Sequence, residues 1–132
     1  MRAASYRKFG PAADVFEFED LPTPAPQPGQ VLVRLHASGI NPLDVKFRAG
    51  DRGPLGGDVA IPHYDGAGVV EAVGEGVDAG RIGERVWILE GRIGRAWGTA
   101  AEYIAIESWR AVPLGETASF EEGACLGIPA VT

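Results

Sequence analysis

The chain has 132 residues, of which 45% are hydrophobic and 23% are charged, and this is enough for one domain with a hydrophobic core. Its net charge of −6 argues against a nucleic-acid-binding surface and, more weakly, against binding to anionic membranes. The single cysteine, Cys125, excludes an internal disulfide and any metal site built from several cysteines. No signal-peptide pattern and no apolar stretch of about 18 residues is present, so we expect a cytoplasmic protein.

The first 29 residues are predicted to be mostly extended. Two short strands are expected at residues 2–6 and 15–19, around a turn at Gly10-Pro11, because apolar and polar residues alternate in the second of them. The prolines that follow exclude a helix or a central strand, so residues 22–29 are predicted to cross the surface in an extended form. A ligand for a proline-binding domain is the alternative interpretation.

The clearest strand and the clearest helix follow each other in the sequence. Residues 30–37 alternate between apolar and polar side chains, and the odd-numbered positions are predicted to face the core. The helix is expected from Asn41 to Gly50, because Asn41 suits an N-cap, Pro42 suits the first helical position and Gly50 suits the C-terminal stop.

The second half of the sequence predicts more short strands. They are expected at residues 68–73, 83–88 and 98–105, with loops at residues 51–60 and 90–97. The capping box Ser119-Phe120-Glu121-Glu122 predicts a helix from Phe120 to about Leu126, which Pro129 ends or interrupts. Many short strands and few short helices indicate a mainly β fold, a small and partly open β-barrel. No Gly-x-Gly-x-x-Gly loop follows a strand, so no dinucleotide-binding fold is predicted within these residues.

Five short motifs, in their order and spacing, resemble the zinc-independent quinone oxidoreductases (zeta-crystallin-like) of the medium-chain dehydrogenase/reductase superfamily. The motifs lie at residues 39–44, 65–74, 83–86, 98–103 and 127–132. The resemblance covers nearly the whole chain but only the N-terminal part of such an enzyme. It implies a GroES-like catalytic domain over residues 1–126, and residues 127–132 would begin the junction to a Rossmann domain that binds the cofactor.

The resemblance also bears on metal chemistry. In the zinc-dependent alcohol dehydrogenases of the superfamily, Cys, His and Cys hold the catalytic metal. The matching positions here are Asn41, Tyr64 and Ile128. An amide, a phenol and an alkyl group do not replace two thiolates and an imidazole around zinc, so no zinc is expected.

The resemblance implies hydride transfer from NADPH to a quinone or to an α,β-unsaturated carbonyl, with the active site in the cleft between two domains. It also implies a homodimer at full length. Two alternatives stay open: a fragment of an enoyl-thioester reductase of the same superfamily, and a free-standing interaction module. The module would bind its partner through the loops at residues 51–60 and 90–98.

Catalytic residues are predicted at Asn41 and Asp44 from the resemblance, and at Tyr64 from the chemistry of its hydroxyl. The Asn41 amide would donate to a carbonyl and line the nicotinamide side of the cleft, although it also suits a helix N-cap. Asp44 would orient a donor or the cofactor ribose, or else stabilise the first helical turn. Tyr64 departs from the family pattern and would donate a proton to the reduced carbonyl, or else be a buried structural tyrosine.

Cofactor contacts are expected from Asn41, Arg48 and Thr132. Arg48 is retained from the family pattern and would hold an anionic cofactor or substrate. Thr132 matches a threonine at the entry to the cofactor domain, where it would touch the nicotinamide ribose. Lys46 replaces a tyrosine that often stacks on the substrate in this family, and Asp65 is interpreted as structural.

Overall fold

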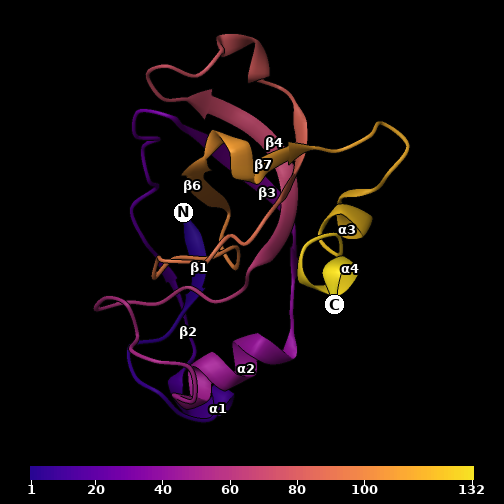
Figure 1. Cartoon of the computed structure of the whole chain (residues 1–132). Coiled ribbons are helices and arrows are strands. Elements are labelled where there is room, and N and C mark those ends of the chain that lie inside the picture. Colours follow the sequence, from indigo (N-terminus) through magenta and orange to yellow (C-terminus); the bar gives the residue numbers. More distant parts are fainter.

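A curled five-stranded antiparallel sheet forms the centre of the computed structural model, which describes residues 1–132 (Figure 1). In sheet order its strands are β6 (Tyr103–Glu107), β3 (Gln30–Gly39), β4 (Asp65–Val73), β5 (Arg85–Ile88) and β7 (Ala111–Pro113). Strands hold 33% of the residues and helices 20%, so the predicted mainly β, GroES-like fold is confirmed. Two register shifts between β3 and β4 interrupt the ladder, and such bulges bend a sheet.

The main core lies on the inner face of this sheet. It consists of small branched or aliphatic side chains: Val31, Val33, Val70, Val86, Ile88, Ile104, Ile106 and Ala111. In β3, Val31 and Val33 are fully buried and Arg34 is exposed, as the alternation at residues 30–37 predicts, but Leu32, expected on the outer face, is buried as well. β-branched residues favour such a pleated, half-buried surface, so local propensity and burial agree here.

A second, smaller sheet pairs β1 (Arg2–Ser5) with β2 (Glu17–Asp20), and α1 (Ala12–Val15) lies between these strands in the sequence. The Ala4 amide donates to the Ala100 carbonyl oxygen at 2.9 Å, which joins β1 to the loop before β6. Tyr6 and Ala60 form an antiparallel β-bridge. Both belong to a separate small core with Val15.

The remaining helices lie at two edges of the molecule. They are α2 (Pro42–Ala49), α3 (Phe120–Gly123) and α4 (Ile128–Val131), with 3-10 turns η1 (Ala79–Arg81) and η2 (Ser108–Arg110). In Figure 1, α1 and α2 lie together at the lower end, and α3 and α4 stand on the right beside the C-terminus. α3 contacts β3, β4 and β5. None of the helices combines the length and apolar character that crossing a membrane requires.

The helix predicted from Asn41 to Gly50 is confirmed. Asn41 is the N-cap of α2, Pro42 opens the helix, and Gly50 ends it in the left-handed conformation with a φ of 90°. The capping box that begins at Ser119 is also present, since Ser119 and Glu122 exchange two hydrogen bonds. α3 ends at Gly123 rather than near Leu126.

Other parts of the prediction were also wrong, among them the start of β4, which lies at Asp65 rather than Gly68. Residues 12–15 form a helical turn closed by the Phe16 amide on the Ala12 carbonyl, so β2 begins only at Glu17. The strand expected at residues 98–105 runs from 103 to 107 instead, because Gly98 and Thr99 donate to the chain at residues 61–63. The short β7 was missed. Pro129 lies in the first turn of α4 instead of ending a helix. The backbone N–H that proline lacks is not needed there, because the first turn of a helix leaves its N–H groups without partners in the helix.

The buried sheet face predicts a clear difference between two isoleucines. Ile106 is fully buried in the main core, whereas Ile82 is 53% exposed. Ile106→Ala should lower the free energy of unfolding by about 2–5 kcal/mol, because it removes methyl groups and leaves a cavity. Ile82→Ala, the matched control, should cost less than about 1 kcal/mol. Urea denaturation followed by tryptophan fluorescence measures both, and equal losses would contradict the assigned core.

Candidate functional site

The buried carboxylate of Asp65, at the start of β4, joins three parts of the chain. Its Oδ2 atom accepts a hydrogen bond from Asn41 Nδ2 at 2.7 Å, and its Oδ1 atom accepts one from the Ile128 amide at 3.0 Å. Asp65 is 1% exposed. A buried carboxylate is costly unless donors satisfy it, so these bonds fix the starts of α2 and α4 relative to β4. This agrees with the structural role expected for Asp65.

Close approach at this point requires glycine at position 127. A Cβ atom on Gly127 would overlap the Asp65 carboxylate oxygen. The backbone N–H of Asn41 donates to Asp44 Oδ2 at 2.7 Å, which ties the first turn of α2 to its own N-cap. Asn41 therefore binds Asp65 with its side chain and Asp44 with its backbone.

A chain of hydroxyl groups runs from the Asp65 backbone to His63. Thr99 Oγ1 donates to the Asp65 carbonyl oxygen at 2.6 Å, so it accepts from Ser38 Oγ, which lies 2.9 Å away. The Ser38 hydroxyl has one proton, and therefore His63 Nδ1, also 2.9 Å from Ser38 Oγ, is the donor in the last contact. Burial, with a smaller contribution from the charge of Arg92, lowers the pKa of His63 to about 4.

Asp44 and Arg92 are buried charges that do not form an ion pair with each other. Both are 4% exposed. Burial raises the pKa of Asp44, while the hydrogen bond from Asn41 and the charge of Arg92 oppose this shift. The Arg92 guanidinium lies over the Phe47 ring, 4.9 Å from its centroid, and 5.8 Å from the centroid of Tyr6.

Tyr64 lies beside this arginine. It is 5% exposed, and its ring centroid is 5.9 Å from that of Phe47 on α2. Burial raises the pKa of Tyr64, and the positive charge of Arg92 opposes the shift, so the phenol is protonated near neutral pH. Tyr64, Phe47 and Arg92 line a cavity of about 210 Å³.

The two loops predicted at residues 51–60 and 90–97 meet at this cavity. The Ile61 amide donates to the Ala96 carbonyl oxygen at 2.9 Å, and Trp97 Nε1 donates to the Val59 carbonyl oxygen at 3.2 Å. Arg52 lines the cavity from the first loop, and Arg95 lines it from the second. The cavity therefore lies between α2 and two loops that hydrogen bonds hold together.

The structure thus brings three of the predicted residues to one end of the molecule. Asn41 and Asp44 lie at the start of α2, and Tyr64 immediately precedes Asp65 at the start of β4. Arg48 is turned away toward the N-terminal segment, where its Nε donates to the Gly10 carbonyl oxygen at 3.2 Å.

Thr132 is exposed at the end of α4, and its hydroxyl donates to the Ile128 carbonyl oxygen at 2.6 Å. Among the residues expected to touch a cofactor, only Thr132 is exposed, and these residues do not form a cradle for phosphate groups. The present chain alone does not fit a whole dinucleotide.

The sequence analysis missed Arg92. The loop that contains it is visibly rich in glycine and arginine, but such a composition is also typical of an exposed turn. Its burial depends on Phe47 and Tyr6, which come from distant parts of the chain. The spacing of residues along the sequence gives no signal for this contact.

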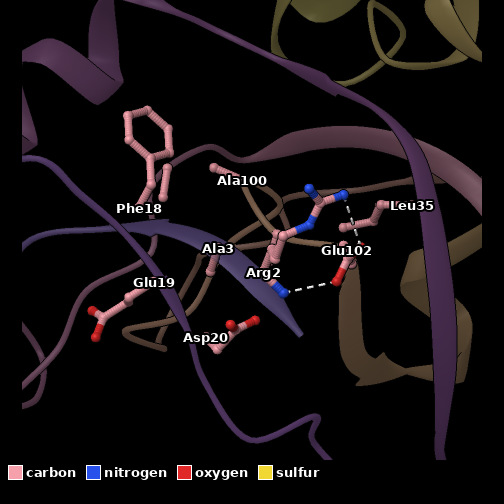
Figure 2. A pocket seen from close by; sticks show the side chains of 10 residues that line it. Arg2, Ala3, Phe18, Glu19, Asp20, Leu35, Ala100 and Glu102 are labelled. Carbon is pink, nitrogen blue, oxygen red and sulfur yellow. Dashed lines mark hydrogen bonds and ion pairs between the residues drawn. The ribbon is translucent and has the colours of Figure 1, made fainter.

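A larger cavity, of about 520 Å³, lies elsewhere and contains none of the predicted site residues (Figure 2). It is lined mainly by the β1–β2 pair and residues 100–102, with the exposed Phe18 at one side. The Arg2 amide donates to Glu102 Oε2 at 2.7 Å. Size alone would select this cavity, but only the smaller one is lined by a predicted site residue, Tyr64, and by a buried arginine, Arg92.

No three His, Cys, Asp or Glu side chains lie close enough together to hold a metal ion.

The sequence pattern of the alcohol dehydrogenase GroES-like domain matches residues 27–116, most of the chain. The chain belongs to this family. The predicted GroES-like domain is therefore confirmed, and the relatives described next confirm the predicted resemblance to quinone oxidoreductases.

Full-length relatives of this GroES-like domain include quinone oxidoreductases. That of Rattus norvegicus is 37% identical over 133 residues, which cover 100% of this chain and 39% of the relative. The solved quinone oxidoreductase of Coxiella burnetii has a TM-score of 0.86 at 30% identity, over 96% of this chain and 41% of that one. A mycobacterial protein solved as a complex with NADPH has a TM-score of 0.76 at 25% identity, over 91% of this chain and 35% of that one. The chain spans about two fifths of the length of these proteins.

The contacts of Asp65 predict a specific sensitivity in the GroES-like domain. In Asp65→Asn, an NH₂ group would face either Asn41 Nδ2 or the Ile128 amide, and one buried donor would lose its acceptor. The free energy of unfolding should fall by about 1–3 kcal/mol. Hydrogen exchange at the Ile128 amide should become faster. The control Asp20→Asn, at an exposed site, should change stability by less than about 0.5 kcal/mol.

The low pKa of His63 predicts a pH-dependent stability. The folded pKa of about 4 lies below the ordinary value of 6.5. The full free energy of unfolding is therefore present above about pH 6.5, and part of it is lost as the pH falls toward 4, because the unfolded state binds a proton first. His63 is partly exposed, so we expect a loss of about 1–3 kcal/mol. His63→Asn should remove this part of the pH dependence, since asparagine tolerates the φ of 77° at this position. His36→Asn should retain it, and an imidazole titration by NMR near pH 6.5 for His63 would contradict the account.

Proposed function

We propose that this GroES-like domain forms the substrate side of an NADPH-dependent, zinc-free reductase that transfers hydride to a quinone or an α,β-unsaturated carbonyl. One observation carries the proposal: the whole chain is similar to quinone oxidoreductases. Asn41, Tyr64 and Ile128, at positions where zinc-dependent enzymes have ligands, support a mechanism without a metal.

The proposed division of labour has two domains. Residues 1–126 form the substrate-side domain, and residues 127–132 begin the connection to a Rossmann domain. NADPH would supply the hydride when it is bound. Thr132, exposed at the end of α4, is proposed to contact the nicotinamide ribose. Arg48 would first have to release the Gly10 carbonyl oxygen to reach an anionic group.

Tyr64 is the proposed donor to the substrate oxygen. Reduction places negative charge on a carbonyl oxygen, and without zinc a hydrogen-bond donor must stabilise it. Burial raises the pKa of Tyr64, which maintains the protonated phenol that this role requires. The neighbouring Arg92 opposes that shift and would also favour the developing anion. The phenol can then pass its proton to the reduced oxygen and regain one from water.

Asn41 and Asp44 are proposed to shape the same site. Asn41 uses one amide hydrogen on Asp65, and its second amide hydrogen can be given to a substrate carbonyl or to the cofactor. Asp44 accepts from the Asn41 backbone and so holds this residue in place. We also propose that the full-length protein is a cytoplasmic homodimer that acts on a small molecule and binds neither nucleic acid nor a membrane.

The full-length protein tests this function directly. NADPH oxidation should be measured with duroquinone, whose fully substituted ring has no free position for the exposed thiol of Cys125 to attack. We expect turnover that a zinc chelator leaves unchanged. Tyr64→Phe should lower kcat about 100-fold, because it removes a donor to the developing charge. Tyr103→Phe, on β6, is the matched control and should retain the rate.

Three results would contradict the proposal. An unchanged kcat in Tyr64→Phe would remove Tyr64 from the chemistry. Activity on an enoyl thioester without activity on quinones or simple enones would favour the enoyl-thioester reductase, and no NADPH oxidation at all would favour the interaction module.

A further inference from the structure

The starting point is a buried arginine without an acidic partner. Arg92 is 4% exposed, yet it takes part in none of the salt bridges of the chain. Its Nε and Nη1 atoms are buried and have no hydrogen-bond partner. Arginine is almost never buried unless it is paired, because removing a charge from water is costly. By contrast, the half-buried Arg95 pairs with Glu107 at 2.8 Å.

The aromatic rings around Arg92 compensate for only part of this cost. Phe47 and Tyr6 offer their faces to the guanidinium at 4.9 and 5.8 Å, and such contacts are attractive. A ring face satisfies the positive charge but not the in-plane N–H groups. Nε and Nη1 are too deeply buried to reach a ligand, so the remaining nitrogen, Nη2, is the donor that Arg92 can offer to an oxyanion in the cavity.

The cavity lined by Arg92 has a composition that fits an anion. Three arginines and no acidic residue are among the nine residues that line it, although the chain as a whole carries a net charge of −6. Arg95 is already bound to Glu107 and to the Ala105 carbonyl oxygen. Arg52, which is exposed and forms no ion pair, and Arg92 remain to bind a ligand.

The positive charge of Arg92 acts to lower the pKa of the buried acid Asp44, but Asp44 does not line the cavity. Its Oδ2 atom accepts from the Asn41 amide, and its Oδ1 atom is buried without a partner. A water between Asp44 and Arg92 is the competing explanation for both unpartnered groups. It accounts for the burial of Arg92 but not for Arg52 at the mouth of the same cavity.

We infer that this cavity, between Phe47, Tyr64, Arg52 and Arg92, binds the carboxylate of a small planar molecule. Arg92 Nη2 and the Arg52 guanidinium can each donate to a carboxylate, and the Phe47 and Tyr64 rings offer an apolar wall to an attached ring or double bond. The volume of about 210 Å³ is below the roughly 300–1,000 Å³ of pockets for drug-sized ligands, so the occupant is small. The inference rests on the proposed function in one respect: it makes the carboxylate a substituent of the reductase substrate.

Benzoate and its neutral isostere benzamide test the site by isothermal titration calorimetry on the full-length protein. We expect benzoate to bind at least 10-fold more tightly than benzamide. Arg92→Gln should abolish benzoate binding, and Arg52→Gln should weaken it about 10-fold. Arg34→Gln, at an exposed position on β3, is the matched control and should bind benzoate as the unmodified protein does.

Equal affinity for benzoate and benzamide, or no benzoate binding, would overturn the inference. If Arg92→Gln fails to fold, Arg52→Gln decides, and unchanged benzoate affinity in that variant overturns the inference. The two proposals fail separately: quinone reduction without benzoate binding removes only the anion site. Benzoate binding that needs both arginines, in a protein that does not oxidise NADPH, removes only the reductase.

Discussion

The hydrogen bonds to the Asp65 carboxylate are the constraint on which the rest of the site depends. Both oxygens accept from groups that other segments supply, the Asn41 side chain and the Ile128 amide. A buried carboxylate without such donors would be strongly destabilising, so folding of β4 is coupled to the positions of α2 and α4. One residue thus sets where Asn41 lies and where α4 begins.

Around this centre, burial determines which groups carry charge. Burial raises the pKa of Tyr6 and Tyr64 and lowers that of His63, so the phenols stay protonated and the imidazole stays neutral near neutral pH. Arg92 therefore brings a buried positive charge beside the rings of Phe47 and Tyr6, in the cavity that Arg52 and Arg95 also line. Such a low-dielectric setting strengthens its effect on a nearby anion. The proposed donor and the proposed anion site share this one charge.

The sequence predicts best those features that local residues decide. The limits of α2 follow from its own Asn41, Pro42 and Gly50, and the alternation of β3 follows from burial of one face. The mainly β fold and the family follow from short motifs, each made of neighbouring residues. The late start of β6 depends on residues 61–63 and was predicted wrongly. α1 was also missed, although its closing hydrogen bond is local.

The candidate site divides in the same way. Asn41, Asp44 and Tyr64 could be selected from the sequence because they stand in or beside recognisable motifs. Arg92 could not, since its burial arises only when its loop packs against Phe47 of α2 and Tyr6 after β1. A crystal structure of the full-length protein with duroquinone would test the central claim most directly. The account predicts the quinone ring beside Phe47, with an oxygen about 2.7–3.1 Å from the Tyr64 hydroxyl. A ring in the larger cavity beside Phe18 would contradict it.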